Sequence, residues 1–347
     1  MELPCRGSKS NEADSASPER RTPVRCALLA TAGVLIAVGT AGCQSWRWQT
    51  AELLGRQPTT DDVMAAVNAN AGIIQTLLAD DVTITIRSGQ RLRERVATAI
   101  ATHLALRGRL AVRKPRYLRL IAGTSFSREL DLGSNDREFW LYVRQAEEPT
   151  LGPGKHPVLY HCTYEEYRRS GAELPLEPQW VIEALGIQEI DPTMNHFLQP
   201  GQRGTVELAT PTTLTNGLPA VIVRVVTLKR GQVIAVRLER GAAVLAESWL
   251  AGHVEDPVTG AVVPTRVSFT WIPSNTTVTL KLRSLRVNPA LDPAQSAQLW
   301  RSPYQQLVGR GLAQAINIAE MARRSRSSAV ELLHPEALEL PNSDGLR

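Results

Sequence analysis

The stretch from Arg107 to Leu120, RGRLAVRKPRYLRL, contains the pattern that dominates this chain of 347 residues. Apolar and basic side chains alternate in it on both sides of Pro115. Alternate residues of a β-strand point to opposite faces, so each half predicts a strand with one apolar and one basic face. Because the Lys114-Pro115 pair breaks the run, the two halves are expected to form an antiparallel pair of strands with one face exposed to solvent.

The same period of two recurs in residues 80–88, 265–273 and 277–283. Together these segments predict a sheet with two chemically distinct faces. The apolar face is expected to contain Val82, Ile84, Ile86, Leu110, Val112, Leu118, Leu120, Val267, Phe269, Trp271, Val278, Leu280 and Leu282. The face toward water is expected to carry Arg107, Arg109, Arg113, Arg119, Lys281 and Arg283.

Further strands are expected at 137–144, 157–162, 204–210, 219–228, 232–239 and 243–253, which makes about eleven in all. Helices are expected at 60–79, 177–186 and 303–324. A sheet with one apolar face must cover that face, either by curling on itself or by packing helices against it. The sequence therefore predicts an α+β domain with few helices.

The N-terminal region ends in a short apolar run, GVLIAVGTAGCQSWRWQ, from Gly33 to Gln49. Basic residues precede the run, as in a secretory signal peptide. The small residues before Cys43 resemble the lipobox of bacterial lipoproteins, which implies cleavage before Cys43 and lipid attachment to its thiol. The alternative is an uncleaved anchor helix, although the run is shorter than the roughly 20 residues of a typical membrane span.

This interpretation divides the chain into five parts. They are a signal peptide (1–42), a lipidated tether (43–58), the sheet domain (59–288), a linker with a C-terminal helix (289–324) and a flexible tail (325–347). With Cys43 acylated, for example by palmitate, Cys162 has no cysteine partner in the exported domain, so the fold must not depend on a disulfide. Gln44 follows the cysteine, which by analogy favours the outer over the inner membrane, with the domain on the periplasmic side.

Several classes of function are disfavoured. The net charge of +5 is spread along the chain, whereas a nucleic-acid-binding surface needs a concentrated basic patch. His161 and Cys162 have the right chemistry for a nucleophile and a base, but neighbours on a strand point to opposite faces. The six histidines are scattered, so neither a metal site nor another cofactor is predicted. An enzyme of unfamiliar type is the weakest alternative, and the oligomeric state is left open.

Two stretches resemble the LolA/LolB family of lipoprotein carriers. RGRLAVRKPRYLRL is similar to that family's strand, basic-proline turn and strand, and DLGSNDREFWLYVR (131–144) is similar to its next hairpin. The chain as a whole resembles uncharacterised lipoproteins of planctomycete-type bacteria. The resemblance implies an open antiparallel half-barrel of about eleven strands, with helices covering the concave face and an apolar cavity for acyl chains.

The cavity implied by this resemblance has four candidate lining residues. Phe269 and Trp271 are the bulkiest residues of the predicted apolar face, Leu280 shares that face, and Trp140 is a candidate from the resemblance only. The expected function is non-enzymatic binding of acyl chains or lipoproteins by a protein attached to the membrane through Cys43, with lipoprotein sorting or transfer as a specific form. The alternative is an envelope scaffold or sensor built on the same fold.

Overall fold

The computed structural model describes residues 54–324, apart from residues 56, 89–103, 125–126, 147–150, 152–154, 173–176 and 203. The predictions for the signal peptide, Cys43, the tether up to residue 53 and the tail after residue 324 lie outside the described residues. Within the described part, no helix is both long and apolar enough to span a membrane.

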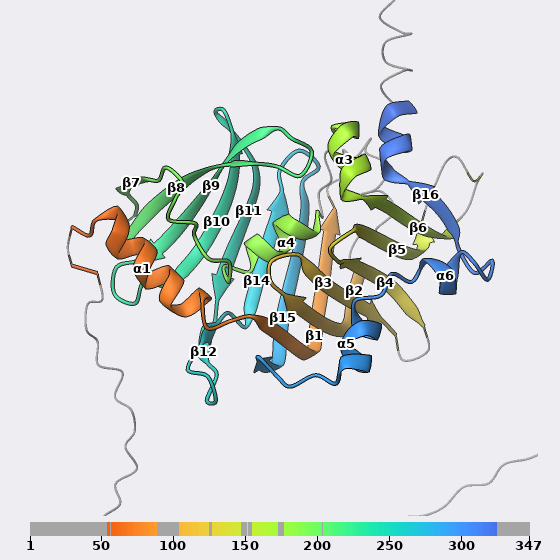
Figure 1. The fold of residues 1–347 in the computed structure, drawn as a ribbon, viewed down its shortest axis with the longest axis horizontal. Coiled ribbons are helices and arrows are strands. Elements are labelled where there is room, and N and C mark those ends of the chain that lie inside the picture. The colour runs from red at the N-terminus through yellow and green to blue at the C-terminus, as the bar shows by residue number, and fades with distance from the viewer. Residues whose placement is uncertain are drawn as a thin grey trace, which may run out of the picture. The chain divides into compact units, whose positions relative to one another are not determined.

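A single sheet of fourteen strands forms the body of the domain (Figure 1). The strand order is β16-β6-β5-β4-β3-β2-β1-β15-β14-β11-β10-β9-β8-β7. One half of this strand order consists of β1 (Thr76–Ser88), β2 (Leu104–Arg113), β3 (Tyr117–Gly123), β4 (Arg128–Ser134), β5 (Glu138–Ala146), β6 (His156–Thr163) and β16 (Gln314–Asn317). The other half consists of β15 (Thr276–Val287), β14 (Arg266–Trp271), β11 (Ala243–Ala251), β10 (Val233–Arg240), β9 (Pro219–Thr227), β8 (Thr205–Thr213) and β7 (Phe197–Pro200).

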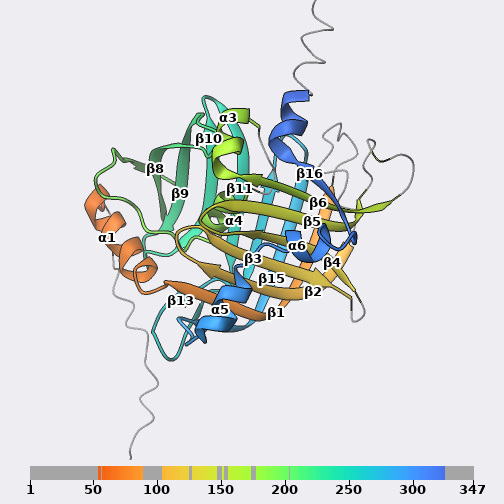
Figure 2. The ribbon, with the colours of Figure 1, turned by 45° about the vertical axis from the view of Figure 1, so that its right-hand side comes forward.

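Every neighbouring pair in this sheet is antiparallel except β6 and β16, and its edges do not meet. The sheet curves around helix α4 (Figure 2). The short strands β12 (Val254–Glu255) and β13 (Val262–Val263) form a separate hairpin. The predicted open α+β half-barrel is therefore confirmed, with more strands than the eleven expected.

The predicted apolar face is also confirmed. Strand pairing places its residues side by side, as in the pairs Ile84–Leu280 and Phe269–Val278. All thirteen are buried, and the most exposed of them, Trp271, retains 6% of its accessible surface. We call this side of the sheet the inner face and the other side the outer face.

The basic residues of the outer face differ in their exposure. Arg107, Arg109, Lys281 and Arg283 are exposed, as predicted. Arg113 is half-buried, with its guanidinium carbon 3.9 Å from the ring centre of Tyr117. The prediction for Arg119 is wrong, because the C-terminal segment covers the outer face at this point and leaves Arg119 only 6% exposed.

Helix α1 (Thr60–Ala71) begins where the sequence predicts and ends earlier. The Thr59 hydroxyl accepts from the Asp62 amide, and the Asp62 carboxylate accepts from the Thr59 amide, which is a capping box. The predicted extension to residue 79 is wrong, because residues 76–79 belong to β1. There Leu77 points to the inner face and Leu78 packs near Trp300 on the outer face.

Helix α4 (Pro178–Ala184) confirms the predicted helix at 177–186. The predicted helix at 303–324 is wrong. The C-terminal segment instead forms α5 (Pro293–Leu299), α6 (Tyr304–Leu307), β16 and a helical stretch at 318–324. Glycine disfavours a continuous helix here, and Gly311 adopts a left-handed conformation with φ of +68°.

Candidate ligand-binding site

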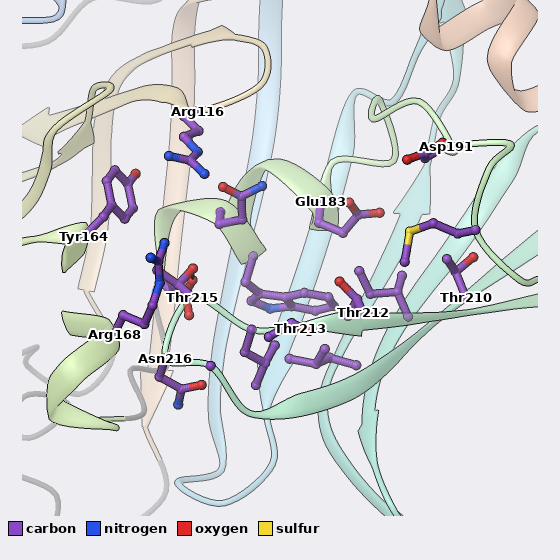
Figure 3. Close-up of a pocket in the computed structure, with 18 of the residues that line it drawn as sticks. Arg116, Tyr164, Arg168, Glu183, Asp191, Thr210, Thr212, Thr213, Thr215 and Asn216 are labelled. Atoms are coloured by element: carbon purple, nitrogen blue, oxygen red, sulfur yellow. Dashed lines mark hydrogen bonds between the residues drawn. The ribbon is translucent and has the colours of Figure 1, made fainter.

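Helix α4 lies against the inner face of the sheet and fills much of it. Val181, Ile182 and Ala184 are almost completely buried, and the Ser248 hydroxyl of β11 donates to the Ala184 carbonyl at 2.9 Å. Beside α4 a pocket of about 510 Å³ remains, bounded by β8–β10 and by the β8–β9 turn at 214–218 (Figure 3). This volume falls within the roughly 300–1,000 Å³ of typical small-molecule sites.

The apolar wall of the pocket comes from the helix and from the sheet. Trp180 projects from α4, Trp271 from β14, Ile222 from β9 and Leu238 from β10. Both indoles are at least 94% buried. Aromatic rings offer large apolar contact surfaces, so this wall suits an aliphatic or aromatic portion of a ligand.

An ion pair in the wall of the pocket joins helix α4 to the sheet. An Arg224 Nη of β9 lies 2.5 Å from the Glu183 carboxylate of α4, and both side chains are largely buried. Arg224 points inward because it pairs with Leu208 and Val236, which also face inward. Since removing one partner of a buried pair leaves an uncompensated charge, the pair fixes α4 against the sheet.

One end of the pocket is rich in polar groups. Figure 3 shows Arg116, Tyr164, Arg168 and Thr215 at this end, while Glu183 lies toward the other. Tyr164 and Arg168 belong to helix α3 (Tyr164–Ser170), and Arg116 to the turn between β2 and β3. Arg116 and Arg168 are exposed at the rim, whereas Tyr164 is buried. We call this region the polar end.

Glu177 is the buried acid of the polar end. The Thr215 hydroxyl donates to its carboxylate. Burial raises the pKa of Glu177 to about 7, and the hydrogen bond from Thr215 only partly opposes this shift. The carboxyl group is therefore divided between its neutral and charged forms near neutral pH.

Two buried donors of the pocket lack a hydrogen-bond partner among the described residues. They are the Tyr164 hydroxyl and the indole Nε1–H of Trp180. Burial also raises the pKa of Tyr164 to about 12, so its hydroxyl keeps its proton. Buried polar groups are nearly always paired, so Trp180 Nε1–H is an unsatisfied donor beside the pocket, whereas the Tyr164 hydroxyl has the Ser134 side chain close to it.

The structure separates the four candidate cavity residues. Trp271 lines the pocket. Phe269 and Leu280 share the inner face, but both are covered by core side chains and lie outside this pocket. Trp140 lies on the outer face under α6, and its Nε1–H donates to Asp131 at 3.2 Å. The strand register explains its position, because its neighbours Phe139 and Leu141 point inward.

His161 and Cys162 point to opposite faces of β6, as predicted. The His161 ring packs on Tyr304 of the outer-face segment, with ring centroids 5.0 Å apart. Cys162 is buried in the inner-face core, and burial raises the pKa of its thiol to about 11. The described residues also contain no cluster of three or more potential metal ligands.

Sequence analysis missed the charged residues of the pocket and also helix α3. Glu183 in WVIEAL and Arg224 in VIVRVV are charges within apolar runs, which is a signal for a buried pair. Thr163 and Glu166 form the capping box of α3, a Thr-x-x-Glu pattern visible in the sequence. Glu165 and Glu166 occupy the first turn of this helix.

Several solved structures are similar to this chain, among them the following three. A domain named for outer membrane lipoprotein sorting, from Vibrio parahaemolyticus, is 11% identical with a TM-score of 0.44, and the match covers 69% of this chain and 98% of that one. A DUF1329 family protein from Desulfovibrio piger is 10% identical, with a TM-score of 0.44 and the same coverage. A LolA superfamily protein from Nitrosomonas europaea is 10% identical, with a TM-score of 0.41 and coverage of 70% and 98%. No family model and no curated protein sequence matches the chain.

Proposed function

We propose that this protein binds the alkyl part of a lipid or of a lipoprotein in the pocket beside α4, without catalysing a reaction. The observation that carries the proposal is the pocket itself, which lies on the inner face of an open sheet and has Trp180, Trp271, Ile222 and Leu238 as its apolar wall. Removing an alkyl chain from water contributes about 0.8 kcal/mol for each buried methylene group.

The proposal includes the location of the protein. Acylation of Cys43 would hold the chain at the periplasmic face of the outer membrane rather than the inner one, and two acyl chains would be needed for stable attachment. An anchored protein with an alkyl-binding pocket could receive or present lipoproteins, which is the specific form of the proposal. The Lol-like resemblance of residues 107–120 and 131–144 supports it.

The test is a binding experiment on the full chain. Lipids that copurify with the protein are extracted and identified by mass spectrometry, and tryptophan emission is then followed during titration with palmitate or a diacylated lipopeptide. We expect a saturable change that is weaker in Trp271→Ala. Trp249→Ala is the matched control, because Trp249 is 55% exposed and does not line the pocket.

A second variant distinguishes loss of ligand binding from loss of folding. Thr212→Phe places a ring in the pocket from a half-buried strand position, and it should abolish the response while the circular dichroism spectrum stays unchanged. A folded wild-type protein without a copurifying lipid and without a saturable response to either ligand would contradict lipid binding. That result would favour the alternative function, an envelope scaffold or sensor that acts through a protein partner.

A further inference from the structure

We propose that the polar end of the pocket is a head-group subsite that selects amphiphiles with an anionic, hydrogen-bond-accepting head group. The inference rests on the proposed function, because the alkyl chain of the same ligand would lie along the apolar wall. It adds the chemical class of the ligand and the residues that distinguish it from other amphiphiles.

The first argument is the excess of donors. Trp180 Nε1–H is buried without a hydrogen-bond partner among the described residues, and the buried Tyr164 hydroxyl has only the Ser134 side chain close to it. An indole nitrogen can only donate, and so can a guanidinium group. The Thr215 hydroxyl already donates to Glu177, so the unused capacity of the polar end consists mainly of donors.

The second argument is charge at the rim. Arg116 and Arg168 line the pocket, and neither forms a salt bridge with a described residue. Arg116 also lies over the ring of Tyr164, with its guanidinium carbon 5.3 Å from the ring centre. Charge-assisted hydrogen bonds from arginine to a carboxylate, sulfate or phosphate are stronger than neutral ones.

The third argument is the position of Glu177 among these groups. It faces Thr215 of the turn at 214–218, and the pocket lining also includes Tyr164 and Arg168 of α3 and Arg116 of the β2–β3 turn. The remaining acid on α4, Glu183, is neutralised by Arg224. Two further acids line the pocket: Glu189 pairs with Lys114 at 3.0 Å, and Asp191 lies toward the other end and accepts from Thr193 (Figure 3). Glu177 is the buried acid of the polar end, and its ionised form would repel an anionic head group.

Binding of an anion should therefore be coupled to protonation of Glu177. Its carboxyl group is poised for this, because burial raises its pKa to about 7 and a bound anion raises that pKa further. Affinity for an anion should increase as the pH falls from 8 to 6, by roughly tenfold for each unit by which the ligand raises the pKa. A protonated Glu177 could also donate to the head group.

The experiment compares probes with the same twelve-carbon chain and different head groups. The full chain is titrated with dodecyl sulfate, dodecyltrimethylammonium and dodecyl maltoside below their micelle concentrations, with circular dichroism to verify the fold. Dodecyl sulfate stays ionised throughout the pH range, so it isolates the titration of the protein. We expect it to bind about tenfold more tightly than the cationic and neutral probes, which corresponds to one charge-assisted hydrogen bond.

Three variants assign the effect to residues. Arg116→Gln and Arg168→Gln should each weaken dodecyl sulfate binding by about fivefold and leave dodecyl maltoside unchanged. Arg169→Gln is the matched control, because Arg169 lies on the same helix, pairs with Glu165 and does not line the pocket. Glu177→Gln should remove the pH dependence between pH 6 and 8.

The outcomes separate the two proposals. Equal affinity for all three probes would overturn the head-group subsite and leave alkyl binding intact. Unchanged affinity of Arg116→Gln and Arg168→Gln for dodecyl sulfate would do the same. Absence of binding by every probe would overturn the proposed function as well. Dodecanoate and dodecyl phosphate then distinguish a fatty acid from a phospholipid as the source of the anion.

Discussion

The carboxylate of Glu183 on α4 and the guanidinium of Arg224 on β9 form a buried ion pair at 2.5 Å, which joins the helix to the inner face of the sheet. Arg224 is also within 3.5 Å of the Thr210 hydroxyl on β8. The pair forms one wall of the pocket, so its stability and the shape of the site are linked.

Replacing one partner of this pair should lower the free energy of unfolding strongly, whereas replacing both partners should lower it little. We expect Glu183→Gln and Arg224→Met each to lower the free energy of unfolding by about 3–5 kcal/mol, because each leaves one buried charge uncompensated. The double variant should recover most of the loss. Urea unfolding of the four proteins measures the coupling, and additive losses in the double variant would contradict an interaction between the two residues.

Stability should fall with rising pH because of Glu177. Burial raises its pKa from 4.5 to about 7, so between these values the folded state holds a proton that the unfolded state has released. Its contribution is complete below pH 4.5 and is lost as the pH rises through 7. Glu177→Gln stays neutral, so it should exceed wild type in unfolding free energy by up to roughly 3 kcal/mol at pH 8.5 and match it near pH 4.

Thermal or urea unfolding of both proteins across this pH range measures the difference. Glu165→Gln serves as the control, because Glu165 is exposed on α3 and should leave the pH profile unchanged. Parallel profiles for wild type and Glu177→Gln would show that Glu177 titrates normally in the folded protein.

Asp131 should be a critical charge of the outer face. It is fully buried, lies 2.6 Å from Arg119 and 2.9 Å from Arg128, and accepts from the Trp140 indole. Asp131→Asn should lower the unfolding free energy by about 3–5 kcal/mol, because Arg119 stays buried without its counter-ion. Glu165→Gln, which breaks a solvent-exposed pair, should cost less than about 1 kcal/mol, and an equal effect of the two substitutions would contradict this account.

The C-terminal segment should be required for stability of the sheet. It covers Trp140 and Leu159, both 0% exposed, and its Arg301 carbonyl accepts from Arg119. A chain ending at Asn288 should lose about 1.5–3 kcal/mol for each large side chain that becomes exposed. A chain ending at Arg324 retains β16 and is the control, so equal melting temperatures for the two chains would rule out a stabilising role for residues 289–324.

Cys43 gives a prediction about processing. Cys43→Ala should leave an unprocessed precursor or a protein released from the membrane, because the thiol is the expected site of lipid attachment. Metabolic labelling with a palmitate analogue and membrane fractionation measure both effects. A Cys43→Ala protein that is processed and membrane-bound like wild type would contradict lipid attachment at Cys43.

The sequence by itself determined the chemistry of the two sheet faces. Alternation between apolar and basic residues is a local property, because the pleat of a strand sends successive side chains to opposite sides wherever the strand lies. For that reason Leu110, Val112, Leu118 and Leu120 could be assigned to one face before their partners were known. The opposite orientations of His161 and Cys162 follow from the same rule.

Only the tertiary structure decided where β1 changes register and what covers each face. Leu77 and Val82 both point inward although five positions separate them, because β1 bulges between Ala79 and Val82. The bulge lies in the pairing of β1 with β2, where the pair Ala79–Leu110 is followed by Val82–Gly108, so the sequence of β1 alone does not reveal it. Its consequence is that the residues before and after it share a core, although their alternation in the sequence is out of phase.

The burial of Arg119 and Trp140 on the outer face and the pocket beside α4 have the same origin. Each arises where segments far apart in sequence meet, as when Glu183 reaches Arg224 and the C-terminal segment covers β3–β6. Periodicity reports which face a side chain occupies, whereas burial depends on what packs over that face. The sequence therefore determined an amphipathic open sheet, and the tertiary contacts decided that one part of its inner face stays open as a pocket with a polar end.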